Sequence, residues 1–388
     1  MSKGTLLLLY IEYNSGVNGL AKVFTSMANE FCNRGYDVVA VTSDEENTSS
    51  FFYLDTRVQW IKLGLVNIKY NIWDKFKREI NRYVIYCDHP YRIKKSKLAV
   101  RKLELLLKNK KMRSIICYDH EAVLVANRLP KYKVPVIAMM HNSVDSILSS
   151  LNAQGIKEEN KVDIHQVLMP SYVEKARQYL STNICYIPNV VKECQHLPQR
   201  QNNTIISIGR LDPVFKRTDI LIKSFGKLAA LYPNWCVYIY GKAEIDNLEY
   251  EKYLHQLIKE FHLENRLFLC GTTHHIEKIL CKADIFAFPS ASEGFPLALT
   301  EAMAAGLPVV GFANADSVNE LIRHHVNGIL CDDGVENFAM GLSTLMKSET
   351  LRMRLGEQAR KDIEQYSPKK VWDQWEALIE TCNTTFSN

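Results

Sequence analysis

The sequence predicts an α/β protein made of two doubly wound, Rossmann-like domains. Short apolar runs suited to buried parallel strands alternate with amphipathic segments of helical length. The alternation occurs twice, once in each half of the chain, and each series is long enough for one doubly wound sheet. Residues 188–203, which are polar and lack periodicity, are predicted to link the two series.

In the N-terminal half, the apolar run at residues 4–13 predicts the first strand. Apolar residues at helical spacing follow over residues 18–35, where Gly35 ends the helix. The further strands predicted in this half span residues 36–43, 113–120, 134–143, 162–171 and 183–190.

The C-terminal half repeats the pattern. Its predicted strands span residues 204–210, 235–242, 266–271, 285–290, 307–312 and 328–331. Its predicted helices are Asp219–Tyr232, Glu249–Phe261, His275–Cys281, Pro296–Ala305 and Asn337–Met346. The last segment, residues 367–382, places its apolar residues on one helical face. We therefore expect an N-terminal domain at 1–195, a C-terminal domain at 203–366, and a helix at 367–388 that packs back on the first domain.

Composition favours a protein that works inside the cell. Hydrophobic residues make up 47% and charged residues 23%, which is typical of a globular protein with substantial cores. The ten cysteines are scattered without a CxxC pair, which favours free thiols in a reducing cytosol over disulfides or a structural zinc site. Neither a signal peptide nor a stretch of ~20 apolar residues is apparent.

The segment from Pro289 to Val310 carries the pattern that best predicts a ligand site. It follows an apolar strand, so its first loop lies at the carboxyl end of that strand, where open α/β sheets bind ligands. Pro296 suits the first turn of the next helix, and Gly306 ends that helix. Backbone N–H groups near Gly294 and Leu297 would then form an anion site of the kind that binds phosphate.

Two carboxylates flank this helix start, Glu293 in the loop and Glu301 about one and a half turns into the helix. Carboxylates can accept paired hydrogen bonds from the vicinal hydroxyls of a ribose or hexose. Eight residues separate the two, which argues against an acid/base pair and for contacts to opposite ends of an extended ligand. The alternative is that both are solvated surface glutamates.

A second cluster of fixed cations follows the strand at residues 204–210. Gly209 and Arg210 end this strand, and Lys216 and Arg217 precede the next helix. Cations at a strand end suit a diphosphate leaving group. Such residues in isolation are more often surface charges, but here they share a sheet edge with the first cluster.

At this point the chain resembles glycosyltransferase family 4, the large retaining group with the GT-B fold, in which two Rossmann-like domains face each other across a cleft. The resemblance covers most of the chain and is strong from about Thr204 onward. Its motifs are GRL with a following Lys at 209–216, EGFPLALTEAMAAGLPVV at 293–310, and NELIRHHVNGILCDD at 319–333. In the N-terminal half they are NGLAKVFTSMANEFCNRGYDVVAVT, VPVIAMMHNS and CYIPNVV.

The resemblance implies a role for each matching residue. Glu301 would bind the ribose, and Glu293 would hydrogen-bond the donor sugar beside the backbone N–H groups of the helix start. Arg210 and Lys216 would stabilise the departing diphosphate. The remaining residues that the resemblance places near the donor are Gly209, Gly294, Phe295, Leu297 and, from the other domain, His141 and the loop at Gly19. For His141 the alternative is a strand-end histidine without a ligand.

Departures from the family pattern concern the phosphate contacts. The family often has two adjacent glycines in the first loop, and here the first is Asn18. It usually has Gly after the Lys, and here that residue is Arg217; the loop between Arg210 and Lys216 is also one residue longer than common. No Asp-x-Asp triplet occurs, so we expect no essential metal and no cofactor beyond the nucleotide-sugar substrate.

Charge is unevenly spread. Residues Ile61–Arg113 hold 16 Lys and Arg but only 4 Asp and Glu, interleaved with Trp73, Phe76, Ile80, Tyr83, Tyr91 and Leu103–Leu107. A basic amphipathic surface with aromatic residues is typical of docking on anionic membranes. The alternative is a solvated basic face. Nucleic acid is disfavoured because no known binding module is visible.

Together these features predict a retaining glycosyltransferase that moves a hexose or N-acetylhexosamine from a nucleotide sugar to a lipid-linked or polysaccharide acceptor. A UDP donor is expected over a GDP donor because UDP sugars are widespread in the family. The setting would be surface glycan synthesis, such as lipopolysaccharide or capsule, by a cytoplasmic protein peripheral on the inner face of the membrane. The alternatives are a catalytically silent GT-B scaffold for another transferase and a sugar-nucleotide epimerase.

Overall fold

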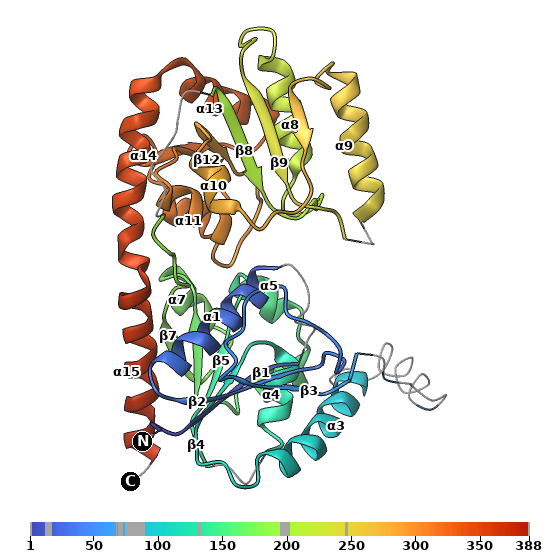
Figure 1. Ribbon diagram of the computed structural model, residues 1–388, viewed down its shortest axis with the longest axis vertical. Helices are drawn as coiled ribbons and strands as arrows, with labels where there is room; N and C mark the ends of the chain where they lie inside the picture. The colour runs from blue at the N-terminus through green and yellow to red at the C-terminus, as the bar shows by residue number, and fades with distance from the viewer. Residues whose placement is uncertain are drawn as a thin grey trace. The chain divides into compact units, whose positions relative to one another are not determined.

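The computed structural model describes residues 2–11, 18–66, 68, 73, 90–129, 133–194, 202–244 and 247–386. Contacts divide the chain into two compact units (Figure 1). Unit 1 comprises Met1–Asn189 with Val371–Asn388, and unit 2 comprises Val190–Lys370. Residues 195–201 of the predicted linker lie outside the described residues.

Unit 1 is built on a seven-stranded parallel sheet in the order β3-β2-β1-β4-β5-β6-β7. Its strands are β1 Thr5–Tyr10, β2 Asp37–Thr42, β3 Gln59–Lys62, β4 Met112–Cys117, β5 Val136–Met139, β6 Ile164–Val167 and β7 Asn183–Tyr186. Its described helices are α1 Gly19–Asn33, α3 Pro90–Leu106, α4 His120–Ala126, α5 Val144–Ser149, α6 Ala153–Glu159, α7 Ser171–Arg177 and most of α15 Pro368–Phe386. The strand order reverses at β1, which lies between β2 and β4.

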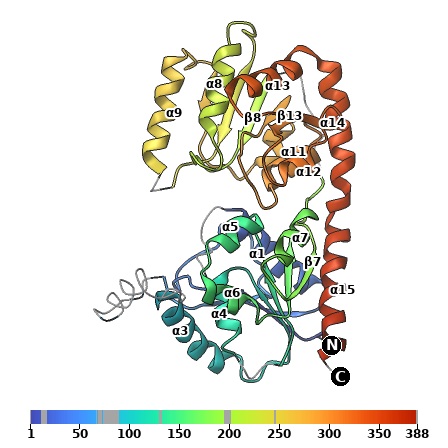
Figure 2. The ribbon, with the colours of Figure 1, turned by 180° about the vertical axis from the view of Figure 1, so that it is seen from behind.

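Apolar residues cover both faces of this sheet, as a parallel sheet requires. On one face, Leu7 and Leu9 of β1 pack in a buried cluster with Leu103 of α3 and Val123 of α4. Near the carboxyl end of β1, Phe24 of α1 joins an aromatic group with Tyr10 and Tyr118. The reverse view shows α4 and α6 in this unit (Figure 2).

Helix α15 packs its apolar face on α1 within unit 1. Trp372 meets Phe31 edge to face at a ring-centroid distance of 6.1 Å. Arg34, which follows α1, pairs with Glu376 at 2.7 Å and with Asp373 at 2.9 Å. The amphipathic segment predicted at the end of the sequence thus forms one continuous helix, and the buried side of this helix packs within unit 1.

Unit 2 repeats the architecture with a six-stranded parallel sheet in the order β10-β9-β8-β11-β12-β13. Its strands are β8 Thr204–Ile208, β9 Cys236–Tyr240, β10 Leu267–Leu269, β11 Ile285–Ala287, β12 Val309–Phe312 and β13 Gly328–Cys331. Its described helices are α8 Thr218–Leu228, α9 Leu248–Glu260, α10 Ile276–Leu280, α11 Leu297–Ala304, α12 Val318–Leu321, α13 Val335–Lys347 and α14 Glu349–Ile363, with the 3₁₀ helix η2 Glu364–Tyr366.

The order in unit 2 reverses at β8, which lies between β9 and β11. Loops that leave β8, β11 and β12 at their carboxyl ends therefore emerge side by side along one edge. A reversal of strand order at this edge is the place where open α/β sheets bind ligands. Both clusters predicted from the sequence fall in these loops.

No helix among the described residues is both long and apolar enough to cross a membrane.

Candidate active site

The loop after β8 begins in close contact with the end of β9. The Gly209 N–H donates to the Tyr240 carbonyl at 3.0 Å. Gly241 has φ +144°, and a Cβ added there would lie 1.8 Å from the Gly209 carbonyl oxygen, so a side chain at this position is excluded. Further along the loop, Asp212 Oδ1 accepts from the N–H groups of Val214 and Phe215 at 2.8 and 2.7 Å. These bonds fix the backbone that carries Lys216.

The structure brings Lys216 and Glu293 together in an ion pair between Nζ and Oε1. Both side chains are largely buried, with exposed fractions of 21% and 13%. The ammonium also lies 5.4 Å from the ring centroid of Phe288, just after β11. The backbones of the two loops are joined directly by a 2.8 Å bond from the Ala291 N–H to the Phe215 carbonyl. Two residues that are 77 positions apart thus share one site.

A third loop, which follows β12, contacts the backbone of Glu293. Ser317, fully buried with φ +61°, donates its hydroxyl to the Glu293 carbonyl at 3.1 Å. A non-glycine residue in the left-handed region is uncommon and is retained where the surroundings fix it. The carboxylate of Glu293 is therefore fixed by Lys216 and its backbone by Ser317.

Helix α11 begins immediately after this carboxylate, with Pro296 as its N-cap and no side-chain hydrogen bond to the cap. Phe295 turns its ring into the core, edge to face with Tyr366 at 5.4 Å. Phe295 can therefore offer a ligand only its backbone. The helix start combines N–H groups at Gly294, Phe295 and Leu297 with the positive end of the helix dipole.

Glu301 lies within α11, half-buried, on the turn after the helix start. Its backbone carbonyl accepts from the Ala305 N–H at 3.0 Å, so the residue is part of a regular helical turn. The two glutamates thus belong to different structural contexts, one in a loop fixed by a cation and one on a rigid helix.

Arg210 extends from the same loop toward the end of β9, where it pairs with Glu244 at 2.9 Å. The exposed fractions of these side chains are 45% and 59%. An exposed ion pair of this kind contributes roughly 0–1 kcal/mol, so Arg210 can exchange Glu244 for another anion at little cost.

Arg217 takes part in the site in a way that the sequence did not reveal. It adopts the left-handed conformation, with φ +46°, at the position where the resembling family has glycine. Its guanidinium makes two 2.9 Å bonds to Asp333 and lies 4.6 Å from the Phe312 ring centroid. Hydrogen bonds from Arg217 lower the pKa of Asp333. These contacts offset the strained backbone and attach the Lys216 loop to the ends of β12 and β13.

In unit 1, His141 follows β5 and stacks on Tyr118 with ring centroids 5.2 Å apart. Burial lowers its pKa to about 3, so the imidazole is neutral at physiological pH. Among the described residues its Nε2 is buried and meets no hydrogen-bond partner. An orphaned buried polar atom costs about 1–3 kcal/mol, which favours a role in contacting a ligand.

Gly19 opens α1, also in unit 1, and is exposed. The departure from the family pattern at Asn18 has a local explanation, because the Asn18 side chain caps the helix by accepting from the Ala21 N–H at 2.7 Å. The preceding residues 12–17 lie outside the described residues.

The described residues contain no group of three or more His, Cys, Asp or Glu side chains placed to hold a metal ion. The expectation that no essential metal is needed stays a prediction.

Comparisons with known proteins bear on this arrangement. Residues 192–362 match the family described as Glycosyl transferases group 1. An uncharacterized glycosyltransferase of Haemophilus influenzae is 26% identical over 378 residues, which cover 95% of this chain and 98% of that protein. The N-acetyl-alpha-D-glucosaminyl L-malate synthase of Bacillus anthracis is 22% identical over 386 residues, covering 93% of each chain.

Among solved structures, a variant of Staphylococcus aureus TarM in complex with Fondaparinux, alpha-GlcNAc-glycerol and UDP has a TM-score of 0.77 and 17% identity. The match covers 97% of this chain and 99% of TarM. The fold is therefore that of the GT-B glycosyltransferases, and the similarity to the Glycosyl transferases group 1 family lies in residues 192–362.

The balance between strain and contacts at Arg217 can be tested by two substitutions. Arg217→Ala keeps the left-handed strain but removes the contacts to Asp333 and Phe312, so we expect a loss of stability of about 1–2 kcal/mol. Arg217→Gly removes the same contacts and also the strain, so it should be about 1 kcal/mol more stable than the Ala variant. Thermal unfolding of both proteins compares them. An Ala variant at least as stable as the Gly variant would contradict the account.

The buried neutral state of His141 predicts a pH dependence of stability. Its folded pKa of about 3 lies below the ordinary value of 6.5, so the folded state binds fewer protons between these limits. The stability contributed by His141 is present above pH 6.5 and is lost as the pH falls through this window. We expect His141→Phe to lose stability less steeply between pH 6.5 and 4.5, measured by urea unfolding. Equal slopes for both proteins would show that His141 titrates normally.

Proposed function

We propose that this chain is a retaining glycosyltransferase that transfers a hexose or N-acetylhexosamine from a UDP sugar to a lipid-linked or polysaccharide acceptor. One observation carries the proposal: the ion pair of Lys216 and Glu293 lies beside the start of α11, whose next turn presents Glu301. A cation and a helix N-terminus can bind the diphosphate of a nucleoside diphosphate sugar, and carboxylates can bind its hydroxyl groups.

The roles divide along the donor molecule. Glu301 binds the ribose hydroxyls, and the N–H groups at Gly294, Phe295 and Leu297 bind the diphosphate. Glu293 hydrogen-bonds the donor sugar. In unit 1, the resemblance to family 4 implies that His141 and the loop at Gly19 contact the sugar and phosphate of the donor.

Lys216 and Arg210 act on the leaving group. In the transfer, the bond from the sugar's anomeric carbon to the diphosphate oxygen breaks, and a bond to the acceptor oxygen forms on the same face. Negative charge accumulates on the departing diphosphate, where fixed cations stabilise it more in the transition state than in the ground state. The acceptor's proton passes to an oxygen of the leaving diphosphate. Cationic side chains thus take the place of a divalent metal.

The choice of UDP over GDP has structural support from the bound UDP in the TarM complex. The relatives point to no single acceptor. The name of the Bacillus anthracis enzyme specifies L-malate, whereas TarM was solved with alpha-GlcNAc-glycerol. We therefore infer the class of acceptor from the surface of unit 1.

Donor binding is tested by calorimetry with UDP and GDP in the presence of EDTA. UDP should bind more tightly than GDP without added metal. Glu301→Gln should weaken UDP binding about 10- to 100-fold, since a hydrogen bond to a charged group is worth about 1.5–3 kcal/mol. Glu260→Gln, at the exposed end of α9, serves as the matched control and should bind as wild type.

Tighter binding of GDP would overturn the choice of base. Binding that requires a divalent ion would overturn the metal-free mechanism. Failure of every nucleotide sugar to bind would favour the alternative of a catalytically silent GT-B scaffold, and formation of an epimerised sugar without transfer would favour an epimerase.

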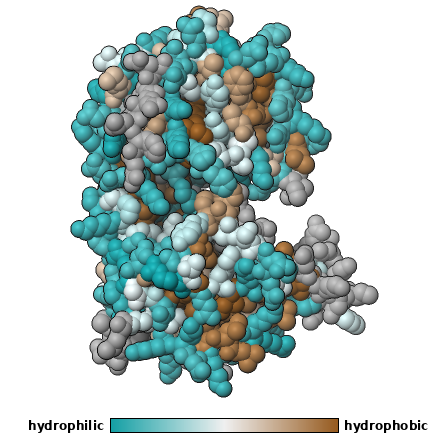
Figure 3. Space-filling view, viewed as in Figure 1, coloured by the Kyte–Doolittle hydropathy of each residue, from teal (hydrophilic) through white to brown (hydrophobic). Residues whose placement is uncertain are grey.

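The membrane part of the proposal rests on α3. This helix carries six cations, and Leu105 and Leu106 at its end are 80% and 50% exposed. Figure 3 shows apolar side chains at the surface over the region of α3 in Figure 1. Of the aromatic and aliphatic residues singled out in the sequence, Trp73 is 70% exposed, whereas Phe76, Ile80 and Tyr83 lie outside the described residues. Cations beside exposed apolar groups suit an anionic lipid surface.

Vesicle sedimentation tests this docking. We expect binding to phosphatidylglycerol-containing vesicles at low salt, weaker binding at 0.5 M NaCl because salt screens the charges, and no binding to pure phosphatidylcholine. Replacing both Leu105 and Leu106 by Asn should reduce binding several-fold. Leu231→Asn, at another strongly exposed leucine in unit 2, should leave it unchanged. A protein that ignores anionic vesicles would refute membrane docking.

A further inference from the structure

The chain passes between the two units twice. The first passage lies between Asn189 and Val190, and the second lies between Lys370 and Val371. We call residues 187–191 the first crossing and residues 366–371 the second crossing. Segments between compact units are commonly exposed and make few contacts. Here one buried residue, Tyr366, belongs to the second crossing and also contacts both the first crossing and the candidate donor site.

The backbone of the first crossing is hydrogen-bonded at both ends. On the side of unit 1, the Ile187 N–H donates to the Val167 carbonyl at 3.1 Å, and the Ile187 carbonyl accepts from the side chain of Gln166. On the side of unit 2, the Val191 N–H donates to the Tyr366 carbonyl at 2.9 Å. Only three residues separate these two fixed points, so the first crossing has little freedom unless one of the bonds opens.

Tyr366 connects this bond to the candidate donor site. It ends the 3₁₀ helix η2, which follows α14, and Figures 1 and 2 both show α14 beside α11. Its ring meets the Phe295 ring edge to face, with centroids 5.4 Å apart and an interplanar angle of 84°. Tyr366, Phe295 and Val191 are 8%, 6% and 3% exposed. Tyr366 thus contacts the first crossing through its carbonyl and the start of α11 through its ring.

The turn that carries Phe295 depends on such contacts for its conformation. Pro296, the N-cap of α11, makes no side-chain hydrogen bond to the helix. Two residues before Phe295, the Glu293 carbonyl accepts from the Ser317 hydroxyl, which fixes the beginning of the turn. The Phe295 ring, packed on Tyr366, fixes the end of the turn, where the backbone N–H groups form the anion site.

The orientation of this turn affects the affinity for a diphosphate. A backbone N–H group binds a phosphate oxygen only when it is directed at it, and the apparent affinity falls with the fraction of molecules that hold the competent conformation. The contact between Tyr366 and Phe295 keeps that fraction high. The same contact joins the turn to the first crossing, so opening of the crossing would disturb the anion site as well.

Ordinary core packing is the alternative explanation for two buried rings in contact. It predicts that loss of the Tyr366 ring lowers stability, as any large-to-small change in a core does. It does not predict that donor binding and opening of the first crossing influence each other. A link between these two properties therefore distinguishes a positioning role from core packing.

We propose that Tyr366 is a positioning residue for the donor diphosphate, and that its contacts make the start of α11 and the first crossing one cooperative unit. This inference rests on the proposed binding of a UDP sugar at α11. A diphosphate bound at the N–H groups of Phe295 and Leu297 stabilises the first crossing, and by linkage a closed first crossing strengthens donor binding by the same factor.

Calorimetry with UDP on variants of the full chain tests the positioning role. Tyr366→Leu and Phe295→Leu each remove one ring of the pair but keep the backbone groups, and each should weaken UDP binding about 3- to 10-fold. Tyr366→Phe keeps the ring and should bind UDP as wild type. The double variant should bind within about twofold of the weaker single variant, because both changes break the same contact.

Limited proteolysis tests the link to the first crossing. Lys192 is exposed and follows Val191, so trypsin cleavage after Lys192 reports opening of this segment. Saturating UDP should slow release of the fragment 1–192, identified by mass spectrometry, about threefold or more in wild type and in Tyr366→Phe. In Tyr366→Leu, saturating UDP should leave the rate unchanged, because the crossing then opens without disturbing the donor site.

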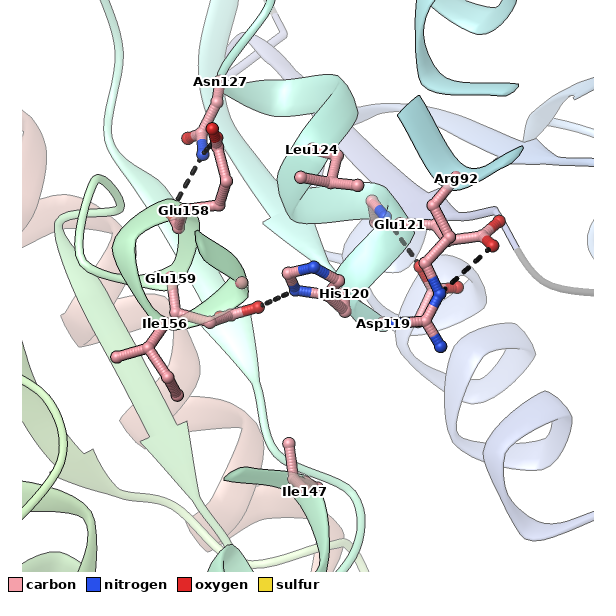
Figure 4. A network of polar contacts seen from close by, with 12 residues as sticks. Arg92, Asp119, His120, Glu121, Leu124, Asn127, Ile147, Ile156, Glu158 and Glu159 are labelled. Carbon is pink, nitrogen blue, oxygen red and sulfur yellow. Dashed lines mark hydrogen bonds and ion pairs between the residues drawn. The ribbon is translucent and has the colours of Figure 1, made fainter. Parts of the chain in front are cut away.

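Two control variants lower stability away from these contacts. Phe225→Leu removes a fully buried ring of α8 in unit 2, 5.2 Å from the Arg266 guanidinium. Glu158→Gln, in unit 1, removes the charge of a carboxylate that accepts from Asn127 at 2.9 Å and joins α6 to α4 (Figure 4). Both should lower thermal stability but keep wild-type UDP affinity and wild-type protection of Lys192 by UDP.

Three outcomes overturn the inference while leaving the transferase intact. The first is a Tyr366→Leu protein with wild-type UDP affinity. The second is an equal loss of affinity in Tyr366→Leu and Phe225→Leu, which would show a general effect of lower stability. The third is a wild-type protein that binds UDP but is cleaved after Lys192 equally fast with and without it. Failure of the wild-type protein to bind any UDP sugar would instead refute the proposed function itself.

Discussion

The ion pair between Lys216 and Glu293 is the interaction on which the candidate site depends. It joins the loop after β8 to the loop after β11, and the bond from Ser317 to the Glu293 carbonyl adds the loop after β12. Each residue neutralises the other in a largely buried place, where a lone charge would be costly. A diphosphate that arrives at the start of α11 brings its own negative charge, so Lys216 can turn to it while Glu293 turns to hydroxyl groups.

Much of this site could be predicted from the sequence, for a physical reason. Parallel strands put their following loops on one edge, so residues that follow apolar strands meet even when they are far apart in the chain. Lys216 and Glu293 follow β8 and β11, which pair directly. Pro296 and Gly306 predicted the start and the end of α11 to within about one residue. The fold class could likewise be predicted, because most strands of both parallel sheets are short apolar runs.

Other features could not be predicted. Helices α4 to α7 have only six or seven residues, too short for a helical period to stand out. Strand β3 has the sequence QWIK and lacks an apolar run. The helix predicted to extend to Tyr232 ends at Leu228. Side-chain partners could be predicted even less: nothing in the sequence connects Arg217 with Asp333 or Ser317 with Glu293, because a hydrogen bond between distant residues leaves no periodicity.

The two units present different chemical groups to a ligand. Unit 2 presents fixed cations and a helix start suited to a diphosphate, whereas unit 1 presents the neutral imidazole of His141. The most direct measurement of the central claim is a crystal structure of the full chain with UDP. The account predicts the diphosphate within hydrogen-bond distance of Lys216 Nζ and the Leu297 N–H, with the ribose hydroxyls on Glu301. A UDP molecule bound elsewhere, with the pair of Lys216 and Glu293 intact, would contradict it.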